Sequence, residues 1–494
     1  MEYGYQGRLW SQGTAVWQYL GTEYINTFGG EGARLHMAIA QILGLGRSGV
    51  GAARLLAHQG FSVTVNDGGT GEKLEELAQP LRESGIAVNL GKNFDPHSAS
   101  QKPDLMVVSP GVPWDLPMVI QSRELGIETI GEMELAWRSL KDIPWIGITG
   151  TNGKTTTTAL TAAMFEAGKR DAPACGNIGD AAAGLALEIL QTGRKLDGVV
   201  AEMSSFQIES LKDLRSQVAV WTTFTPDHLN RHHTLDNYFE IKASLLERAE
   251  VQIINSDDDN LRSRLGATNR FPDAIWTSVK GKQALPTNAD RGVYMEDGWA
   301  IAQGTPIVPV QSLKMVGAHN YQNLLMAIAG AMALGLEREA IAQAVEEFPG
   351  VPHRLEWVVS WQGVPFINDS KATNYDAAVV GLQSVERPTI LIAGGKAKAG
   401  DDNLWMKEIG DRAAAVLLIG DAAETFAKRF EDTDFDRYEI VGTMEAAVKR
   451  AMELSPHIGA KSVLLSPACA SFDQYASFEE RGDDFRARCA AWMS

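Results

Sequence analysis

A glycine-rich segment with a lysine and a run of threonines, WIGITGTNGKTTTT at 145–158, has the residue types needed to bind a nucleotide phosphate. Its glycines permit backbone angles and close approaches that a Cβ would forbid. Backbone N–H groups at the start of the following helix attract phosphate, Lys154 adds a positive charge, and Thr155 offers a hydroxyl to Mg²⁺. The segment therefore predicts ATP binding by Gly150, Thr151, Asn152, Gly153, Lys154, Thr155 and Thr156.

The glycine spacing of this segment departs from the usual phosphate loop. Four residues normally separate the first glycine from the GK pair, which would place that glycine at Ile148. Here the glycines stand at Gly147 and Gly150, so the loop is a variant. A chance glycine-rich turn is the alternative, but a strand, GxxGKT and a helix in succession favour a nucleotide site.

Acidic and imidazole side chains follow the apolar strands predicted after this loop. Glu202 closes GVVAE, His228 follows QVAVWTTFTPD, and Asp257–Asp259 follow VQIINS. Such groups at neighbouring strand ends beside a phosphate loop suit a hard divalent cation. Each residue alone is equally compatible with an exposed loop or a satisfied polar group. Glu202 and His228 together predict a metal site.

A second glycine motif, GLGRSG at 44–49, lies near the start of the chain and follows the predicted strand AIAQIL. Asp67 ends the next strand, SVTVND, so the segment has the pattern of a βαβ unit. In such units a diphosphate binds at the helix N-terminus, and the acid contacts a ribose or base. The alternative is a tight turn with packing glycines. A dehydrogenase interpretation leaves the second phosphate site unexplained.

A third group of polar residues follows strands predicted after residue 351. Asp369 and Lys371 come directly after VPFIN, while Lys396 and Lys398 lie in the loop GGKAKAG. Lysines among glycines are more often solvated than functional, but two such loops at one sheet edge favour a binding site. The polar residues that follow strands here also include Ser370, Thr373, Asn374 and Ser471, with Phe472 beside them.

Strands and helices alternate along the chain from residue 39 onwards. Apolar runs such as SVTVND, QVAVWTTF and PTILIAGG are typical of buried strands. The alternation predicts an α/β fold with mostly parallel sheets and ligands at the carboxyl ends of the strands. Length favours three domains: an N-terminal Rossmann-like domain at 37–140, a central phosphate-loop domain at 141–350 and a C-terminal Rossmann-like domain at 351–494.

Residues 1–36 differ from the rest of the chain. They contain aromatic residues and glycines but neither a sustained helical or strand period nor the pattern of a secretory signal. The segment MAIAQILGLGRSG, which begins at Met37, looks like a natural domain start. We therefore expect residues 1–36 to be a disordered extension or the product of an upstream start site.

Bulk composition excludes several classes of protein. The net charge of −17 over 494 residues argues against general nucleic-acid binding, which needs a basic face. No run of about eighteen apolar residues predicts a membrane span. Three unevenly spaced cysteines, Cys175, Cys469 and Cys489, indicate free thiols in a reducing compartment. We expect a cytoplasmic monomer.

With these motifs assembled, the chain resembles the Mur ligases, ATP-dependent enzymes that add amino acids during peptidoglycan synthesis. The resemblance runs from Met37 to the C-terminus and rests on GTNGKTTT, GNIG at 176–179, TPDHLNRH, GAHNYQN, PHR at 352–354 and NDSKATN. Further features resemble the members that add D-glutamate, namely GLGRSG with SPG at 109–111, AEMSSFQIE, and SPACASFDQYASFEERG at 466–482.

The resemblance implies roles for individual residues at the nucleotide and the metal. Lys154, Asn177, His228 and Lys242 would be catalytic, and Lys242 would be carbamylated to bridge a second Mg²⁺. The metal ligands would be Thr155, Glu202, His228 and Lys242. ATP would also contact Asn320, Asn323, Arg354 and Asp369.

The resemblance also implies two substrate sites. The uridine diphosphate substrate would contact Gly46, Arg47, Ser48, Asp67, Ser109, Gly111, Asn177, Ser204 and Gln207. D-Glutamate would contact Lys371, Thr373, Lys398, Ser471, Phe472 and Phe478.

The reaction implied by the resemblance begins when the terminal carboxylate of UDP-N-acetylmuramoyl-L-alanine attacks the γ-phosphorus of ATP. The amine of D-glutamate then displaces phosphate from the acyl phosphate. Both steps gather negative charge, which Lys154 and two Mg²⁺ ions would stabilise. The base for the amine stays open between Asp227 and His228.

Two alternatives remain at this point. Another amino-acid ligase of the superfamily, of the L-alanine, diaminopimelate or folylpolyglutamate type, would share the central ATP site and differ at both ends. A nucleotide-dependent switch protein would explain the phosphate loop, but the base-reading NKxD motif is absent from the sequence. The switch also gives the Lys371 and Lys398 loops no role.

Overall fold

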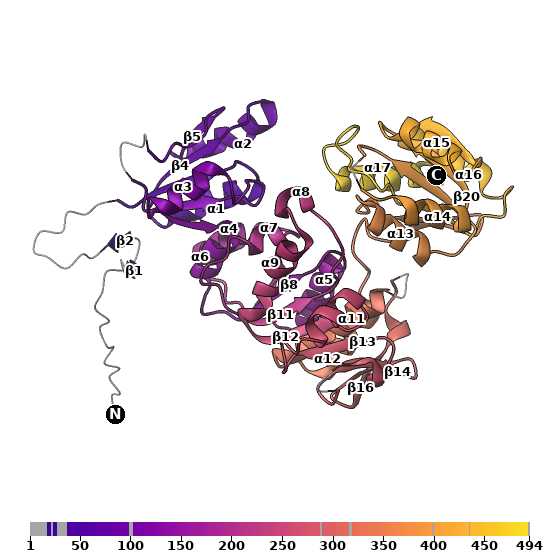
Figure 1. Ribbon diagram of the computed structural model, residues 1–494, viewed down its shortest axis with the longest axis horizontal. Coiled ribbons are helices and arrows are strands. Elements are labelled where there is room, and N and C mark those ends of the chain that lie inside the picture. The colour runs from indigo at the N-terminus through magenta and orange to yellow at the C-terminus, as the bar shows by residue number, and fades with distance from the viewer. Residues whose placement is uncertain are drawn as a thin grey trace, which may run out of the picture. The chain divides into compact units, whose positions relative to one another are not determined.

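A computed structural model describes residues 37–97, 102–286, 289–315, 319–397, 400–433 and 435–492, together with the backbone of 17–20 and 23–26 (Figure 1). The chain forms two compact units. One contains residues up to 149 with 171–219 and 226–250, and the other contains 150–170, 220–225 and the residues from 251 onwards. No helix in the described part of the chain is both long and apolar enough to cross a bilayer.

The structure assigns two short strands within residues 1–36, β1 (Trp17–Leu20) and β2 (Glu23–Asn26), which pair antiparallel. The sequence pattern did not predict these strands. The remaining residues of the segment lie outside the described part, so the expectation of a disordered extension or an upstream start site stays a prediction.

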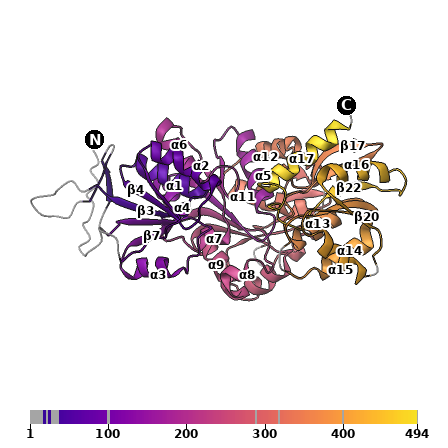
Figure 2. The same cartoon turned by 90° about the horizontal axis from the view of Figure 1, so that it is seen from above.

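Five parallel strands form the first large sheet, in the order β5-β4-β3-β6-β7. Helix α3 packs Val119 against Met106 and Val108 of β6 in one core cluster. It lies on the opposite side of the sheet from α1 and α2 (Figure 2). The elements are β3 (Ile39–Leu43), α1 (Arg47–His58), β4 (Ser62–Asp67), α2 (Glu72–Glu83), β5 (Ala87–Leu90), β6 (Leu105–Val108), α3 (Pro117–Glu124), β7 (Glu128–Gly131) and α4 (Glu132–Ser139).

The central sheet has the strand order β16-β15-β14-β13-β12-β11-β8-β10-β9. Every residue of β8 and β10 is buried, which is typical of parallel strands covered on both faces. The strands are β8 (Trp145–Thr149), β9 (Ala174–Gly176), β10 (Val199–Glu202), β11 (Ser216–Trp221), β12 (Ala249–Asn255), β13 (Ile275–Ser278), β14 (Val293–Glu296), β15 (Trp299–Ala302) and β16 (Thr305–Pro309).

Helices follow most of the parallel strands of the central sheet. Helix α5 packs against α11 and α12. The α-helices are α5 (Lys154–Ala167), α6 (Ala182–Thr192), α7 (Ser205–Ile208), α8 (Leu229–His232), α9 (Leu235–Glu247), α10 (Asp259–Leu261), α11 (His319–Ala333) and α12 (Arg338–Glu347). Shorter turns are the π-helix η1 (Arg262–Gly266) and the 3₁₀ helices η2 (Lys282–Ala284) and η3 (Val310–Ser312).

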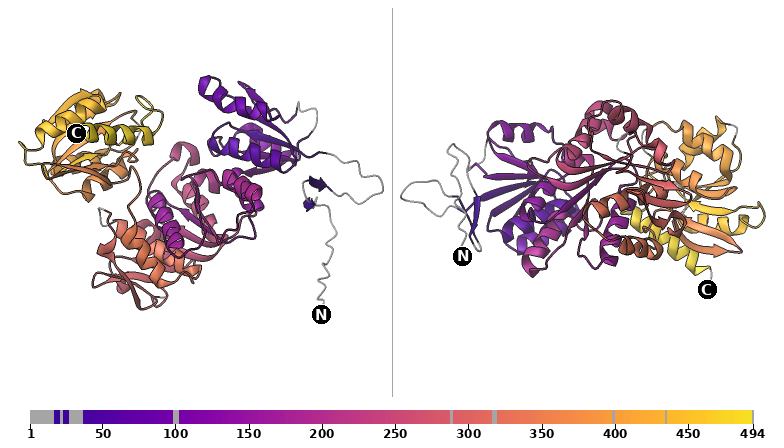
Figure 3. Two further views of the ribbon diagram at one scale, coloured as in Figure 1. Left: turned by 180° about the vertical axis from the view of Figure 1, so that it is seen from behind. Right: turned by 90° about the horizontal axis from the view of Figure 1, so that it is seen from below.

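The third sheet has the order β17-β18-β22-β19-β20-β21, and all its strands except β17 run parallel. One core cluster joins it to α13, α14 and α15, and a second joins it to α16 and α17. The sheet and these helices form the orange and yellow part of the ribbon in Figure 3. The elements are β17 (Glu356–Trp361), β18 (Val364–Asn368), α13 (Tyr375–Ser384), β19 (Thr389–Gly394), α14 (Asn403–Arg412), β20 (Ala413–Ile419), α15 (Ala423–Glu431), β21 (Tyr438–Gly442), α16 (Met444–Leu454), β22 (Ser462–Leu465) and α17 (Phe478–Ala491).

The predicted α/β fold with mostly parallel sheets is confirmed. Each predicted domain range contains one of the three large sheets. The two compact units divide the chain differently, so the exact domain boundaries at 140 and 350 stay predictions.

Candidate functional site

The loop between β8 and α5 has a conformation that requires its glycines. Gly150 and Gly153 have positive φ values of 151° and 85°. A Cβ at Gly153 would lie 2.5 Å from Asn323 Oδ1, and one at Gly150 would overlap the Thr222 hydroxyl. The loop can therefore follow this path only if both positions are glycine, which has no Cβ.

Threonines after β11 hold this loop in place. Thr151 N donates to Thr223 O at 2.8 Å, and Asn152 N donates to Thr223 Oγ1 at 2.8 Å. The Thr225 backbone N–H donates to Thr151 Oγ1 at 3.0 Å. These bonds fix the backbone before any ligand arrives, as a phosphate-binding loop requires.

Lys154 folds back over the same loop. Its Nζ donates to the carbonyl oxygens of Gly150 and Thr151, both at 2.9 Å. Thr155 and Thr156 follow it on the first turn of α5 and are buried. Thr156 Oγ1 has no hydrogen-bond partner among the described residues. The ammonium group thus lies over the loop where a phosphate would bind.

A cavity of about 290 Å³ in the second unit gathers most of the predicted ATP contacts. Asn152 and Gly153 of the loop line it together with Asn323, Arg354 and Asp369. Asn320 lies beside it and accepts a hydrogen bond from Asn323 Nδ2 at 3.2 Å. The structure therefore brings together residues that are more than 200 positions apart in the sequence.

Asp369 is the buried carboxylate of this cavity. Its Oδ2 accepts a hydrogen bond from Ser466 Oγ at 3.0 Å, and its Oδ1 accepts one from Leu355 N at 3.3 Å. Burial raises the pKa of Asp369 to about 7, although the nearby Arg354 charge opposes the shift. This carboxylate is therefore poised to gain or lose a proton near neutral pH.

In the first unit, Glu202 and Asn177 form a pair at the ends of β10 and β9. Asn177 Nδ2 donates to Glu202 Oε1 at 3.0 Å. A Cβ at Gly176 would lie 2.5 Å from Glu202 O, so this close approach requires the glycine. Glu202 is 1% exposed, and its Oε2 has no hydrogen-bond partner among the described residues. A divalent cation would satisfy this oxygen.

Lys242 and His228 occupy different environments in this unit. Lys242 is 1% exposed, and its Nζ donates to Thr149 Oγ1 at 3.2 Å and lies 4.9 Å from the Tyr238 ring centre. His228 is partly exposed, has a positive φ of 53°, and its Nε2 lies 3.4 Å from Asp227 Oδ2. The described residues contain no group of three or more His, Cys, Asp or Glu side chains able to hold a metal. Hydroxyl and phosphate oxygens would therefore have to complete the coordination.

The predicted uridine-diphosphate contacts at the first glycine motif already bond to backbone groups. Asp67 accepts from Leu45 N at 2.7 Å and from Gly69 N at 2.8 Å. Ser109 Oγ donates to Gly44 O at 2.8 Å. Both side chains therefore shape the turn, and their contact with substrate stays a prediction.

The remaining predicted contacts in this unit lie at helix starts and in loops. Arg47 Nη1 donates to Gly179 O at 2.8 Å, so it joins the glycine turn to the GNIG loop. Ser204 and Gln207 form a capping box at the start of α7. Gly46 caps α1, and Ser48 lies in its first turn. Gly111 follows β6 in an exposed turn.

The structure places five of the predicted D-glutamate contacts after two strands of the third sheet: Lys371 and Thr373 follow β18, and Ser471, Phe472 and Phe478 follow β22. Lys371 Nζ lies 5.2 Å from the Phe478 ring centre, and Thr373 N donates to Lys371 O at 2.9 Å. Ser471 is buried, whereas its neighbour Phe472 is 70% exposed. The sixth predicted contact, Lys398, lies outside the described residues.

Sequence reasoning missed a buried arginine that holds these loops. Arg481 on α17 donates to Ser370 Oγ at 3.0 Å, to Ser370 O at 2.8 Å and to Cys469 O at 3.1 Å. Its Nη1 has no partner among the described residues, and burial lowers the pKa of Arg481 to about 10. In the sequence Arg481 stands in EERGDD, which is typical of an exposed helix, so no local signal marks it.

Comparison with known proteins agrees with this geometry. A family model described as the Mur ligase middle domain matches residues 148–331, and one described as the Mur ligase MurD-like N-terminal domain matches residues 39–131. UDP-N-acetylmuramate-alanine ligase MurC from Thermotoga maritima shares the fold, with a TM-score of 0.57 and 20% identity over 92% of this chain and 100% of that one. The two family models thus place the chain among the Mur ligases.

Relatives that match almost the whole chain show which family of Mur ligases it belongs to. A UDP-N-acetylmuramoylalanine--D-glutamate ligase from Microcystis aeruginosa is 58% identical over 91% of this chain and 99% of its own. The ligase of the same name from Nostoc punctiforme is 54% identical over 93% of this chain and 97% of its own. The chain belongs to the UDP-N-acetylmuramoylalanine--D-glutamate ligase family.

Proposed function

We propose that this protein joins D-glutamate to UDP-N-acetylmuramoyl-L-alanine with the conversion of ATP to ADP and phosphate, as a step in peptidoglycan synthesis. The relatives named for this activity cover almost the whole chain at 54–58% identity. The observation that carries the proposal is the cavity in which Asn152 and Gly153 of the phosphate loop meet Asn323, Arg354 and Asp369.

The first step forms an acyl phosphate. A carboxylate oxygen of the UDP substrate attacks the γ-phosphorus, and the bond to the β-phosphate oxygen breaks to release ADP. Lys154 exchanges its bonds to the loop carbonyls for phosphate oxygens and stabilises the charge that develops there. Arg354 provides a second positive charge at the same cavity.

In the second step the amine of D-glutamate attacks the acyl carbon and phosphate leaves with the bonding electrons. The amine must lose a proton, for which Asp227 and His228 are the candidate acceptors. The pair Asn177 and Glu202 supports an orienting role for this amide, because its Nδ2 is fixed on the carboxylate.

The donors present fit a magnesium ion. In the first unit, Glu202 offers a buried carboxylate oxygen without a partner among the described residues, and His228 offers an imidazole. Magnesium, when bound, neutralises charge on phosphate oxygens. We further propose a second ion held by Lys242 in its carbamylated form, because Lys242 is buried beside Thr149 and a carbamate would supply a carboxylate-like ligand there.

The positions of the loops support two substrate sites. The uridine diphosphate would bind at the glycine turn before α1, where Gly46 leaves open space for a ligand. D-Glutamate would bind among Lys371, Thr373, Ser471 and Phe478, with Phe472 and Lys398 beside them. The buried free cysteines are compatible with a cytoplasmic enzyme, and we propose that it acts as a monomer.

The test is ATP-dependent phosphate release with UDP-N-acetylmuramoyl-L-alanine and Mg²⁺, comparing D-glutamate with L-glutamate, L-alanine and diaminopimelate. We expect release with D-glutamate alone and a product heavier by one glutamyl unit. Release with another amino acid would retain the ligase chemistry and overturn the proposed amino-acid pocket. ATP binding without release under any condition would support the switch alternative.

A further inference from the structure

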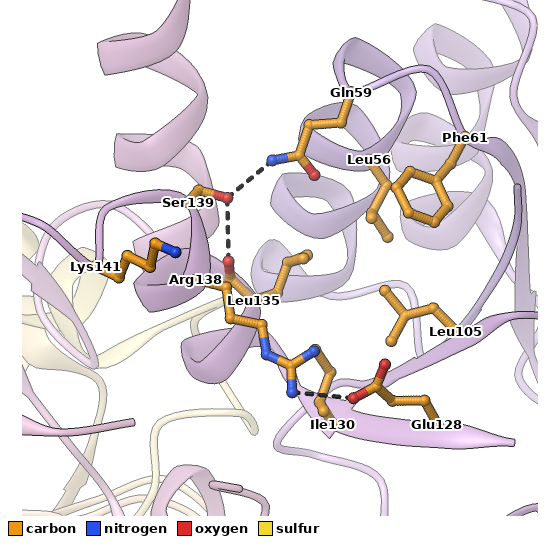
Figure 4. A pocket seen from close by; sticks show the side chains of 10 residues that line it. All are labelled: Leu56, Gln59, Phe61, Leu105, Glu128, Ile130, Leu135, Arg138, Ser139 and Lys141. Carbon is orange, nitrogen blue, oxygen red and sulfur yellow. Dashed lines mark hydrogen bonds and ion pairs between the residues drawn. The ribbon is translucent and has the colours of Figure 1, made fainter. Parts of the chain in front are cut away.

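A second cavity, of about 240 Å³, lies in the first unit and contains none of the residues assigned to the reaction. Figure 4 shows its walls, which come from the C-terminal end of α1, the starts of β6 and β7, and the end of α4. Leu105 and Glu128 are the first residues of their strands. Ser109 follows the opposite end of β6, and the glycine turn follows the same end of the parallel neighbour β3. The cavity is therefore separate from the proposed nucleotide site.

The cavity has an apolar floor. Leu56, Leu105, Ile130 and Leu135 line it and are buried, and Phe61 adds an aromatic ring at its side. Pockets for drug-sized ligands usually measure about 300–1,000 Å³. This cavity is smaller than that, so it suits a single ring or a branched aliphatic group and excludes a nucleotide.

The charged groups around the cavity are paired, with one exception. Arg138 bonds to Glu128 and Glu134 at 3.1 Å and to Asp213 at 3.0 Å. Lys212 also pairs with Glu128, at 2.9 Å. Glu134 further accepts hydrogen bonds from three backbone N–H groups at Lys212, Asp213 and Leu214. The carboxylates of Glu128, Glu134 and Asp213 are thus all in ion pairs.

Lys141 is the exception. It lines the cavity, is exposed, and has no ion-pair or hydrogen-bond partner among the described residues. In Figure 4 its ammonium group points towards Ser139, whose hydroxyl accepts a hydrogen bond from Gln59 Nε2 at 2.9 Å. An apolar floor with one unpaired cation at its rim is complementary to a small amphipathic anion.

We propose that this cavity is a binding site for a small monocarboxylate with an aromatic or branched aliphatic body. The body lies on Leu56, Leu105 and Ile130, and the carboxylate pairs with Lys141 at the rim. The ends of α1 and α4 meet here through Gln59 and Ser139, while their first turns lie at the proposed uridine-diphosphate turn and beside α6. The site is distinct from the substrate sites and can be occupied together with them.

The test is ligand-observed ¹⁹F NMR on the full chain with 4-fluorophenylacetate as the probe and its neutral amide as the matched ligand. A fragment of this size binds with a Kd on the order of 1 mM. We expect line broadening with the acid and weaker binding of the amide. Addition of ATP and UDP at saturating concentration should leave the signal unchanged. Displacement by either nucleotide, or equal binding of acid and amide, would overturn the proposal.

Two variants locate the probe. Lys141→Gln should weaken binding about threefold, as expected for an exposed ion pair, whereas Lys195→Gln, at another exposed lysine of this unit, should not change it. Ser139→Cys can be capped with N-ethylmaleimide because Cys175, Cys469 and Cys489 are buried. The capped protein should lose the probe signal and the uncapped protein should keep it. Unchanged binding after capping would refute the site, and the melting temperature of each variant checks its folding.

Discussion

Asn177 Nδ2 donates a hydrogen bond to Glu202 Oε1 at 3.0 Å, and this bond leaves Glu202 Oε2 as a buried oxygen without a described partner. A carboxylate in this state is costly unless a cation or a proton accompanies it. The bond also fixes the direction in which the second oxygen points. If Glu202 holds the proposed Mg²⁺, the Asn177 amide orients its free oxygen, and a change at either residue should therefore weaken metal binding.

Replacement of Glu202 tests this relationship. Glu202→Gln keeps the size of the side chain and the acceptor for Asn177 but removes the charge that would bind Mg²⁺. We expect ligase activity to fall by about 100-fold or more and the Mg²⁺ concentration for half-maximal activity to rise. Asn177→Ala should lower activity by about 10–100-fold. An unchanged Mg²⁺ dependence in the well-folded Glu202→Gln protein would remove Glu202 from the metal site.

Substitution of Gly150 should weaken ATP binding. A Cβ there would overlap the Thr222 hydroxyl and lie 2.9 Å from Thr223 N, at a φ of 151°. We expect Gly150→Ala to weaken ATP binding in calorimetry by at least about tenfold because the loop must move. The matched control is Gly184→Ala in α6, where no atom lies within 4 Å of the added methyl group. Equal ATP affinity in both variants would contradict the proposed role of the loop.

Asp369 should make stability depend on pH. Its pKa rises from an ordinary value of 3.8 to about 7 in the folded chain. Between these values the folded state binds more protons than the unfolded state, so this residue lowers stability as pH rises from about 4 to 7. Asp369→Asn removes the effect. We expect the variant to gain stability over the parent protein by roughly 2–4 kcal/mol at pH 8 and by little at pH 4.

Urea unfolding of both proteins across this pH range measures that difference. The buried His232 and the partly buried His319, whose pKa values desolvation lowers to about 4, titrate in the same window and cancel in the comparison. A constant difference between the two proteins from pH 4 to pH 8 would show that Asp369 does not retain its proton in the folded state.

Phe472 offers a test of the amino-acid site that leaves the core intact. Its side chain is 70% exposed, so Phe472→Ala should change stability by less than about 0.5 kcal/mol. If the ring covers bound D-glutamate, the KM for D-glutamate should rise several-fold while the KM for ATP stays constant. Trp492→Ala, at the exposed aromatic residue that caps the C-terminal end of α17, should change neither value.

Local patterns predict most of the fold because parallel buried strands are apolar along their whole length. The runs at β8 and β10 were recognisable for this reason. The strands β14, β15 and β16, which form antiparallel pairs, were missed since each is only partly buried. The antiparallel strand β17 has no buried residue and was missed for the same reason.

In the candidate site, some contacts have a local sequence signal and others join residues that are far apart in the sequence. Ser204 and Gln207 carry the S-x-x-Q pattern of a capping box, a local signal that sequence reasoning could have used. The Asp67 contact to Leu45 spans 22 positions, and the Arg481 contact to Ser370 spans 111. No spacing rule reaches across such separations, so these bonds became visible only with the folded chain.

The strand order of the third sheet also constrains how the chain is synthesised. β22 lies between β18 and β19, although the ribosome makes it after every other strand of that sheet. Until Ser462–Leu465 emerges, β18 and β19 each present an open edge that cannot close on its neighbour. The newly made chain therefore keeps β18 separated from β19 until the last strand is translated, and during that interval their unpaired edges are open to aggregation.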